Sequence, residues 1–237
     1  MPGADPRAMS HSWLFTGPPG SGRSLAAIDF AAALMCTDPE EPGCGRCEAC
    51  RAVLETKQHT DLVLVDPQEV IIPVDTVREV IGRAASLPTV APWRVVIFNN
   101  ADRLNNNGAN ALLKTVEEPP ARTVIIMCAP SDAPEDFSQT LRSRCRHLYI
   151  PSPSVESITA QLVSEGASDH DAHLAALTSL RHVGRARRLV NDPAVQKRRA
   201  VAINLAEEVF HGSQGFQAVT SLLKFCLLYT SDAADEE

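Results

Sequence analysis

The stretch Trp13-Leu14-Phe15-Thr16, continued by Gly17-Pro18-Pro19-Gly20-Ser21-Gly22-Arg23-Ser24, decides the fold of this chain. Its apolar start predicts a short buried strand, and residues 25–35 after the loop have the composition of a helix. A strand, a glycine-rich loop and a helix in this order are typical of a phosphate-binding loop (P-loop), where backbone N–H groups converge on phosphate oxygens. The sequence therefore predicts an α/β domain built on a P-loop.

The P-loop carries an unusual cation. Gly17, Gly20 and Gly22 suit the loop and Ser24 suits the hydroxyl that binds magnesium, but Arg23 stands where a P-loop has lysine. A planar guanidinium is wider and less adaptable than an ammonium group, so this exchange is not neutral. Two interpretations stay open, a loop that binds ATP and a structural turn that has lost its nucleotide. We favour the second.

Further strand candidates alternate with helical patterns up to residue 150. Each candidate is a short, mostly apolar run, as burial on both faces of a parallel sheet requires. The predicted strands are Trp13 to Thr16, Asp61 to Val65, Arg94 to Phe98, Thr123 to Cys128 and His147 to Ile150. The best helices are predicted at residues 74–87, where apolar side chains recur at helical spacing, and 107–117. We expect a parallel sheet with covering helices.

The strand predicted at residues 94–98 is followed by amides. Asn99 and Asn100 stand where a P-loop ATPase carries the acidic side chains that hold magnesium and activate water. An amide cannot take a proton from water, and it is a poorer magnesium ligand than a carboxylate. Asp102 is the nearest substitute, but it lies past the strand end, in the following turn. We therefore expect no ATP hydrolysis by this chain.

Four of the seven cysteines lie close together in sequence, at Cys36, Cys44, Cys47 and Cys50. Four thiolates from one short segment can surround a single tetrahedral Zn²⁺, and a closed Cys₄ shell indicates a structural metal. A redox pair, an iron–sulfur cluster and unpaired thiols are the alternatives. The other cysteines are predicted to be buried thiols; they are Cys128, Cys145 and Cys226.

Pro151-Ser152-Pro153-Ser154 ends the strand pattern, and only helical segments follow, at residues 155–164, 172–180, 195–210 and 216–228. We expect a core domain over residues 1–151 with the cysteine module at 36–50 inserted in it. A small helical domain should cover residues 152–191, and the start of a third domain residues 192–226. Residues 227–237 change composition abruptly, so we interpret them as a non-native tail.

The composition limits the function classes. The formal net charge of −7 argues against a surface that binds nucleic acid throughout. The sequence shows neither a secretory signal nor a long apolar run, so we expect a cytoplasmic protein. A basic stretch remains, which either contacts nucleic acid or forms a solvated helix face. It comprises Arg181, Arg185, Arg187, Arg188, Lys197, Arg198 and Arg199.

Three segments together resemble the delta-prime family of bacterial DNA polymerase III clamp-loader subunits, which are AAA+ proteins. The first is residues 110–120, Asn-Ala-Leu-Leu-Lys-Thr-Val-Glu-Glu-Pro-Pro, and the second is residues 141–146, Leu-Arg-Ser-Arg-Cys-Arg. The third is the cysteine cluster. The resemblance covers residues 12–191, and it implies an AAA+ core with a zinc module, a helical lid domain and the start of a helical collar. We expect the chain to be shorter than family members at both ends.

The resemblance also implies a function. The chain would help to load the sliding clamp onto primed DNA, with gamma/tau and delta subunits as partners, as part of the DNA polymerase III holoenzyme, a nucleotidyltransferase. Arg144 would be an arginine finger for a neighbouring ATPase subunit, because a guanidinium at the γ-phosphate stabilises the transition state. Spacing alone would favour a solvated basic stretch. Arg187 resembles the arginine of the lid that senses nucleotide. The alternatives are an active gamma/tau-type motor subunit and a zinc-dependent DNA-binding module.

Overall fold

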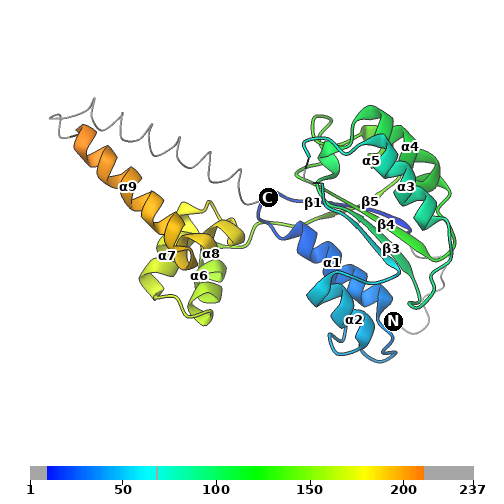
Figure 1. Ribbon diagram of the computed structural model, residues 1–237, viewed down its shortest axis with the longest axis horizontal. Coiled ribbons are helices and arrows are strands. Elements are labelled where there is room, and N and C mark those ends of the chain that lie inside the picture. The colour runs from blue at the N-terminus through cyan, green and yellow to red at the C-terminus, as the bar shows by residue number, and fades with distance from the viewer. Residues whose placement is uncertain (1–9, 68, 211–237) are drawn as a thin grey trace. The chain divides into compact units, whose positions relative to one another are not determined.

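The computed structural model describes residues 10–67 and 69–210, and its centre is a five-stranded parallel sheet (Figure 1). The strand order is β2-β3-β4-β1-β5. The strands are β1 Ser12–Thr16, β2 Leu62–Val65, β3 Arg94–Phe98, β4 Thr123–Ala129 and β5 Arg146–Tyr149. All five predicted strands are confirmed, and no strand end differs from its predicted position by more than one residue. In the register, Thr16 at the end of β1 lies between Ala129 of β4 and Tyr149 of β5.

Side chains of β1, β2, β3 and β4 alternate between two apolar cores, one on each face of the sheet. Leu14, Val96 and Ile125 point into one core, which α3, α4 and α5 cover. Their chain neighbours point into the other core, which α1 covers (Figure 1). This two-sided burial explains why these four strands are almost wholly apolar, whereas the edge strand β5 is mostly exposed and begins with Arg146 and His147.

Short helices complete the first unit. On one side of the sheet lie α1 Arg23–Met35, α2 Glu48–Arg51 and the π-helix η1 Ala52–Thr56. The other elements are α3 Val74–Ala84, the 3₁₀ turn η2 Ala101–Arg103, α4 Asn106–Glu117 and α5 Gln139–Arg142. Asn105 begins α4 because its side chain accepts a hydrogen bond from the Gly108 backbone N–H.

The helix predicted at residues 74–87 is too long. α3 ends at Ala84, and Leu87, which the pattern placed on the buried stripe, is 63% exposed. The Arg94 guanidinium accounts for this early end, because its Nη1 donates hydrogen bonds to the carbonyl oxygens of Arg83 and Ser86. A side chain from the neighbouring strand thus satisfies carbonyls that the next helical turn would have used.

A buried ion pair closes the same end of the sheet. Asp61, just before β2, is fully buried, and its Oδ1 lies 3.0 Å from Nη2 of Arg94 at the start of β3. The carboxylate also accepts backbone N–H bonds from Thr89, Val90 and Ala91 at 2.8–2.9 Å. Asp61 therefore fixes both the neighbouring strand and the segment that connects α3 to β3.

The described chain divides into two compact units between Pro153 and Ser154. The second unit contains α6 Val155–Ser164, α7 Asp169–Thr178, α8 Val183–Asn191 and α9 Pro193–Phe210. Its small core is made of Ile158, Leu162, Ala172, Ala175, Ala176 and Ala186. The segment predicted at 216–228, with Cys226, lies outside the described residues. None of the described helices combines the length and apolar content that crossing a membrane needs.

Candidate functional sites

The glycine-rich loop between β1 and α1 has the backbone of a P-loop. A Cβ at Gly17 would lie 2.3 Å from the Ile150 carbonyl oxygen, so no other residue fits there. Gly20 and Gly22 have φ values of 86° and 90°, which favour glycine. Gly22 begins α1, whose first backbone N–H groups face the loop. The loop conformation therefore depends on all three glycines that the sequence singled out.

The Arg23 side chain bends back onto this loop. It is only 9% exposed, and its Nη1 donates a 2.7 Å hydrogen bond to the Gly17 carbonyl oxygen. Within the described residues, Nε of Arg23 and Oγ of Ser21 are buried without a hydrogen-bond partner. The guanidinium therefore binds the loop that, with a lysine, would receive phosphate oxygens.

The amides after β3 lie where the strand ends. Asn99 N–H donates to the Val65 carbonyl oxygen at 2.9 Å, while its buried Oδ1 has no partner in the described chain. Asn100 turns the backbone with φ 52°, and Asp102 follows in the η2 turn. Asp102 lines a hollow of about 150 Å³ together with residues of α4 and of the segment 134–138. No residue of the P-loop lines that hollow, which is evidence against Asp102 as a substitute carboxylate.

The three arginines of residues 141–146 have three different environments. Leu141 and Cys145 are buried and anchor the segment, and between them Arg144 is exposed. Arg144 Nε donates to Glu117 Oε1 at 2.6 Å. Arg146, in contrast, lies over the Trp13 ring at 5.3 Å, a cation–π contact.

Arg142 belongs to a polar network that reaches the P-loop strand. Its Nε donates to Asp132 Oδ2 at 3.0 Å, and its Nη2 lies 3.1 Å from Nδ1 of His147. The other ring nitrogen of His147 lies 2.6 Å from Oγ1 of Thr16, the residue before Gly17. The hydrogen bond from Arg142 is the main cause that lowers the pKa of Asp132. This network ties the arginine-rich segment to the end of β1.

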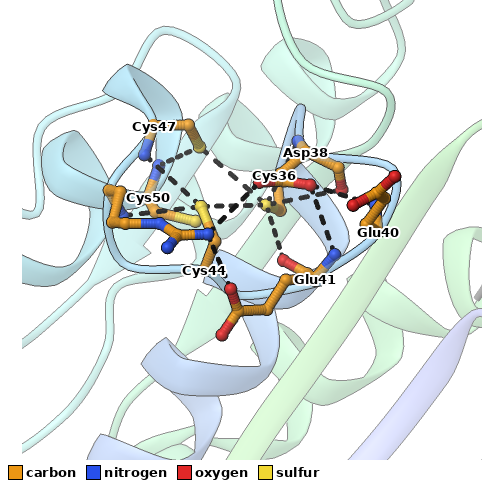
Figure 2. A network of polar contacts seen from close by, with 8 residues as sticks. Cys36, Asp38, Glu40, Glu41, Cys44, Cys47 and Cys50 are labelled. Atoms are coloured by element: carbon orange, nitrogen blue, oxygen red, sulfur yellow. Dashed lines mark hydrogen bonds and ion pairs between the residues drawn. The ribbon is translucent and has the colours of Figure 1, made fainter.

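The four clustered cysteines come together as one site (Figure 2). All four sulfurs lie within 4.8 Å of one another, and Sγ of Cys36 is 3.7 Å from Cys44 and 3.9 Å from Cys47. Four sulfurs at about 2.3 Å from a tetrahedral metal would be about 3.8 Å apart. The distances therefore fit a single metal ion held by all four residues.

Local geometry builds this metal-binding site. Gly43 and Gly45 have positive φ values, 79° and 68°, which turn the chain around the sulfurs. Burial raises the pKa of Cys47, but hydrogen bonds from Thr37 and Cys50 outweigh it and lower the pKa to about 6. Cys128 and Cys145, by comparison, are buried thiols as predicted, and burial raises the pKa of each to about 12.

Arg187, the predicted sensor, is paired within its own unit. Its Nε and Nη2 both contact the Glu165 carboxylate, with Nη2 2.6 Å from Oε1. This hydrogen bonding lowers the pKa of Glu165 and raises the pKa of Arg187. The rest of the basic stretch is distributed over α8, α9 and the turn before α8.

Sequence comparison assigns the family. The model of the family described as "DNA polymerase III, delta subunit" matches residues 4–154. The chain belongs to this family. The delta-prime subunits of Pseudomonas aeruginosa and Escherichia coli are 35% and 34% identical to it over 67% and 70% of this chain. These matches cover 49% and 50% of the relatives, so this family member spans about half the length of each.

Further similarities are to a tau subunit and to two solved structures. The tau subunit of Bacillus subtilis is 29% identical over 66% of this chain and 27% of its own length. Among solved structures, a DNA polymerase III gamma-subunit-related protein of Thermotoga maritima matches with a TM-score of 0.48 and 19% identity. That match covers 83% of this chain and 58% of the other. The Thermotoga maritima RuvB Holliday junction branch migration motor matches with a TM-score of 0.48 and 16% identity, and the match covers 77% of this chain and 54% of the RuvB chain.

The fold of this family member is α/β, as predicted, with a parallel sheet and covering helices. The P-loop between β1 and α1 and the helical unit after the sheet agree with this prediction. The sequence analysis did not predict the partners of the arginine-rich segment 141–146, which are Glu117, Asp132, His147 and, through His147, Thr16. A signal was available for Glu117, because an acidic residue at the last position of a helix opposes the helix dipole and invites a cationic partner.

Proposed function

We propose that this DNA polymerase III family member is a delta-prime-type clamp-loader subunit that supports ATP hydrolysis by a neighbour and carries out none itself. Arg23 folded onto its own loop and the amides Asn99 and Asn100 after β3 support the second half of this proposal. Without a carboxylate at these positions, the site lacks the group that would orient a magnesium ion and the attacking water.

The observation that carries the proposal is the contrast between Arg23 and Arg144. The cation of the P-loop is buried and turned inward, whereas Arg144 is exposed on an anchored segment. A guanidinium that acts on another subunit's triphosphate has to be reachable from outside and held in place. Arg144 meets both requirements, so we assign to it the role of arginine finger in trans.

The proposed partners are gamma/tau and delta subunits, and through the assembled complex the sliding clamp and primer–template DNA. In this arrangement residues 152–191 act as the lid domain, α9 begins the collar, and the complex works in the cytoplasm. Arg187, although paired with Glu165, remains the candidate sensor of the lid. The likeness to B. subtilis tau keeps a motor subunit as the second candidate function.

A reconstitution experiment tests the proposal. The chain alone should release no phosphate from ATP, whereas its addition to gamma/tau and delta subunits should allow DNA-stimulated ATP turnover and clamp loading on primed DNA. Steady phosphate release by the isolated chain that is lost on changing Ser24 to Ala would instead establish the motor-subunit function. A complex that is equally active without this chain would contradict the proposed role directly.

We also propose that the ion bound by the Cys₄ site is Zn²⁺ and that its role is structural. All four positions of a tetrahedral ion would be taken by thiolates, which leaves none for a substrate. The only basic side chain of the module, Arg46, is paired with Glu41 at 2.7 Å and lies 3.7 Å from Asp38. This pairing is evidence against a DNA-reading zinc module.

Metal analysis of the purified protein should find about one zinc per chain. Changing Cys47 to Ser should abolish this metal and accelerate backbone hydrogen exchange in residues 36–50, because the ligands would no longer hold the turn. Changing Cys128 to Ser, in the core, is the control that leaves the zinc content unchanged. Iron with visible absorbance, or less than about a tenth of a zinc per chain, would exclude the zinc assignment.

A further inference from the structure

The Arg144 guanidinium is held on two sides and left open on the third. Nε donates to Glu117 Oε1 at 2.6 Å, and Nη1 donates to the Thr140 carbonyl oxygen at 2.8 Å and to Ser143 Oγ at 3.2 Å. A guanidinium has five N–H donors in one plane. Among the described residues, Nη2 has no acceptor, so its two donors are left for an incoming anion.

Glu117 supplies the only charged contact to Arg144 in the described part of the chain. It is the last residue of α4, a helix fixed to the core by the buried Leu112 and Val116. A carboxylate at a helix C-terminus opposes the helix dipole, so its place there is unfavourable without a cation nearby. The position of Glu117 is therefore set by the core, while its charge is balanced by Arg144.

The ion pair between Glu117 and Arg144 can orient the Arg144 side chain and is weak enough to let it bind another anion. The side chains of Arg144 and Glu117 are 36% and 46% exposed, and ion pairs at such exposure are weak. A triphosphate carries more negative charge than one carboxylate and can engage Nη2 while Nε stays on Glu117. The pair thus limits the orientations of a long flexible side chain at little cost to its reach.

We propose that Glu117 is a positioning residue that orients Arg144 so that Nη2 faces the triphosphate bound by a neighbouring subunit. This inference rests on the proposed function, because it presupposes that Arg144 acts in trans. Ser143 and the Thr140 carbonyl complete the same arrangement from the Arg144 segment itself. Glu117 touches no substrate in this scheme and acts only through Arg144.

The test is the DNA-stimulated ATPase of the reconstituted complex with Glu117→Ala. We expect turnover at saturating ATP to fall about three- to five-fold with an unchanged KM for ATP, because a weak surface pair contributes roughly this much. Glu117→Gln should recover part of the loss, since its amide oxygen still accepts the Nε–H. Glu118→Ala is the matched control, an exposed neighbour that forms no ion pair with any described residue, and it should leave turnover unchanged.

Combination with Arg144→Ala separates this inference from the proposed function. When Arg144 is already alanine, Glu117→Ala should cause no further loss. If Arg144→Ala alone has no effect, the trans role fails. If Arg144→Ala lowers ATP turnover but the Glu117→Ala complex turns over ATP at least as fast as the unaltered complex, the trans role of Arg144 stands and the positioning role of Glu117 is excluded. Equal melting temperatures of the Glu117 and Glu118 variants show that folding does not cause the difference.

Discussion

Changing Arg144 to Ala should lower the hydrolysis rate at the neighbouring ATP site about 10³-fold, because arginine fingers contribute 10³ to 10⁵ to this step. The loss should appear in the chemical step and not in assembly, since Leu141 and Cys145 anchor the segment independently of the Arg144 side chain. Arg144→Lys should recover only part of the rate, because an ammonium group cannot hold Glu117 and a phosphate oxygen in one plane.

Single-turnover measurements on a complex in which only the adjacent subunit is competent would isolate this effect. Arg78→Ala provides the control, because Arg78 is also an exposed, ion-paired arginine of the first unit, bound to Asp75 at 3.0 Å on α3. It should not change the rate. An Arg144→Ala complex that hydrolyses ATP as fast as the Arg78→Ala complex would show that Arg144 is an ordinary surface side chain.

Asp61→Asn should lower the free energy of unfolding by about 3–5 kcal/mol, the range found when a buried ion pair loses one partner. The change leaves the Arg94 guanidinium, 7% exposed, without its anion. It also weakens the hydrogen bonds that hold Thr89, Val90 and Ala91. Such a loss is a large part of the 5–15 kcal/mol that typically stabilises a domain. Urea unfolding followed by circular dichroism would measure it.

Asp75→Asn is the control for Asp61→Asn, because it breaks the exposed pair with Arg78 and should cost less than about 1 kcal/mol. A double variant that combines Asp61→Asn with Arg94→Met should regain part of the lost free energy of unfolding, since the second substitution removes the unpaired buried charge. If both Asp variants unfold at the same urea concentration, the buried pair does not stabilise the fold.

Acid should weaken the same contact. Burial by itself raises the pKa of Asp61, but the backbone donors of Ala91, Thr89 and Val90 and the Arg94 guanidinium outweigh it and hold the pKa well below its usual range. A carboxylate with a lowered pKa stabilises the fold above its unfolded pKa of about 3.9, and this stability is lost progressively as the pH falls below that value. Asp61→Asn should therefore flatten the decline of stability between about pH 5 and pH 2.

The parts of the molecule that sequence analysis predicted are those with a local pattern. The P-loop, the strands and the Cys₄ cluster each lie within a short run of residues, so spacing and composition reveal them. β1 to β4 are nearly continuous apolar runs because both faces of the sheet are covered there. Cys36 joins Cys44, Cys47 and Cys50 through one turn of the chain, which keeps that site local as well.

The contacts that sequence analysis missed join residues far apart in the chain. Asp61 and Arg94 are 33 positions apart, and Glu117 and Arg144 are 27 apart. The position of Glu117 at a helix end indicates that a cation lies nearby, but nothing in the sequence at one member of such a pair identifies the other. The end of α3 was misplaced for the same reason, since Arg94, outside the helix, takes its last carbonyl groups. The bounds of α8 were not predicted, and its residues were interpreted as part of a basic stretch with Arg187 as a sensor, because the buried stripe of this helix is narrow, with Ala186 as its buried residue.

The network from Thr16 through His147 and Arg142 to Asp132 also limits which amino-acid substitutions these four positions can accept during the evolution of the family. Each of the four side chains is a hydrogen-bond partner of the next one in the network. A substitution at one position therefore leaves its neighbour without a hydrogen-bond partner until a second substitution supplies one. Relatives should therefore replace these residues as a set, and the residue that precedes the first loop glycine should vary together with the residues at positions 132, 142 and 147.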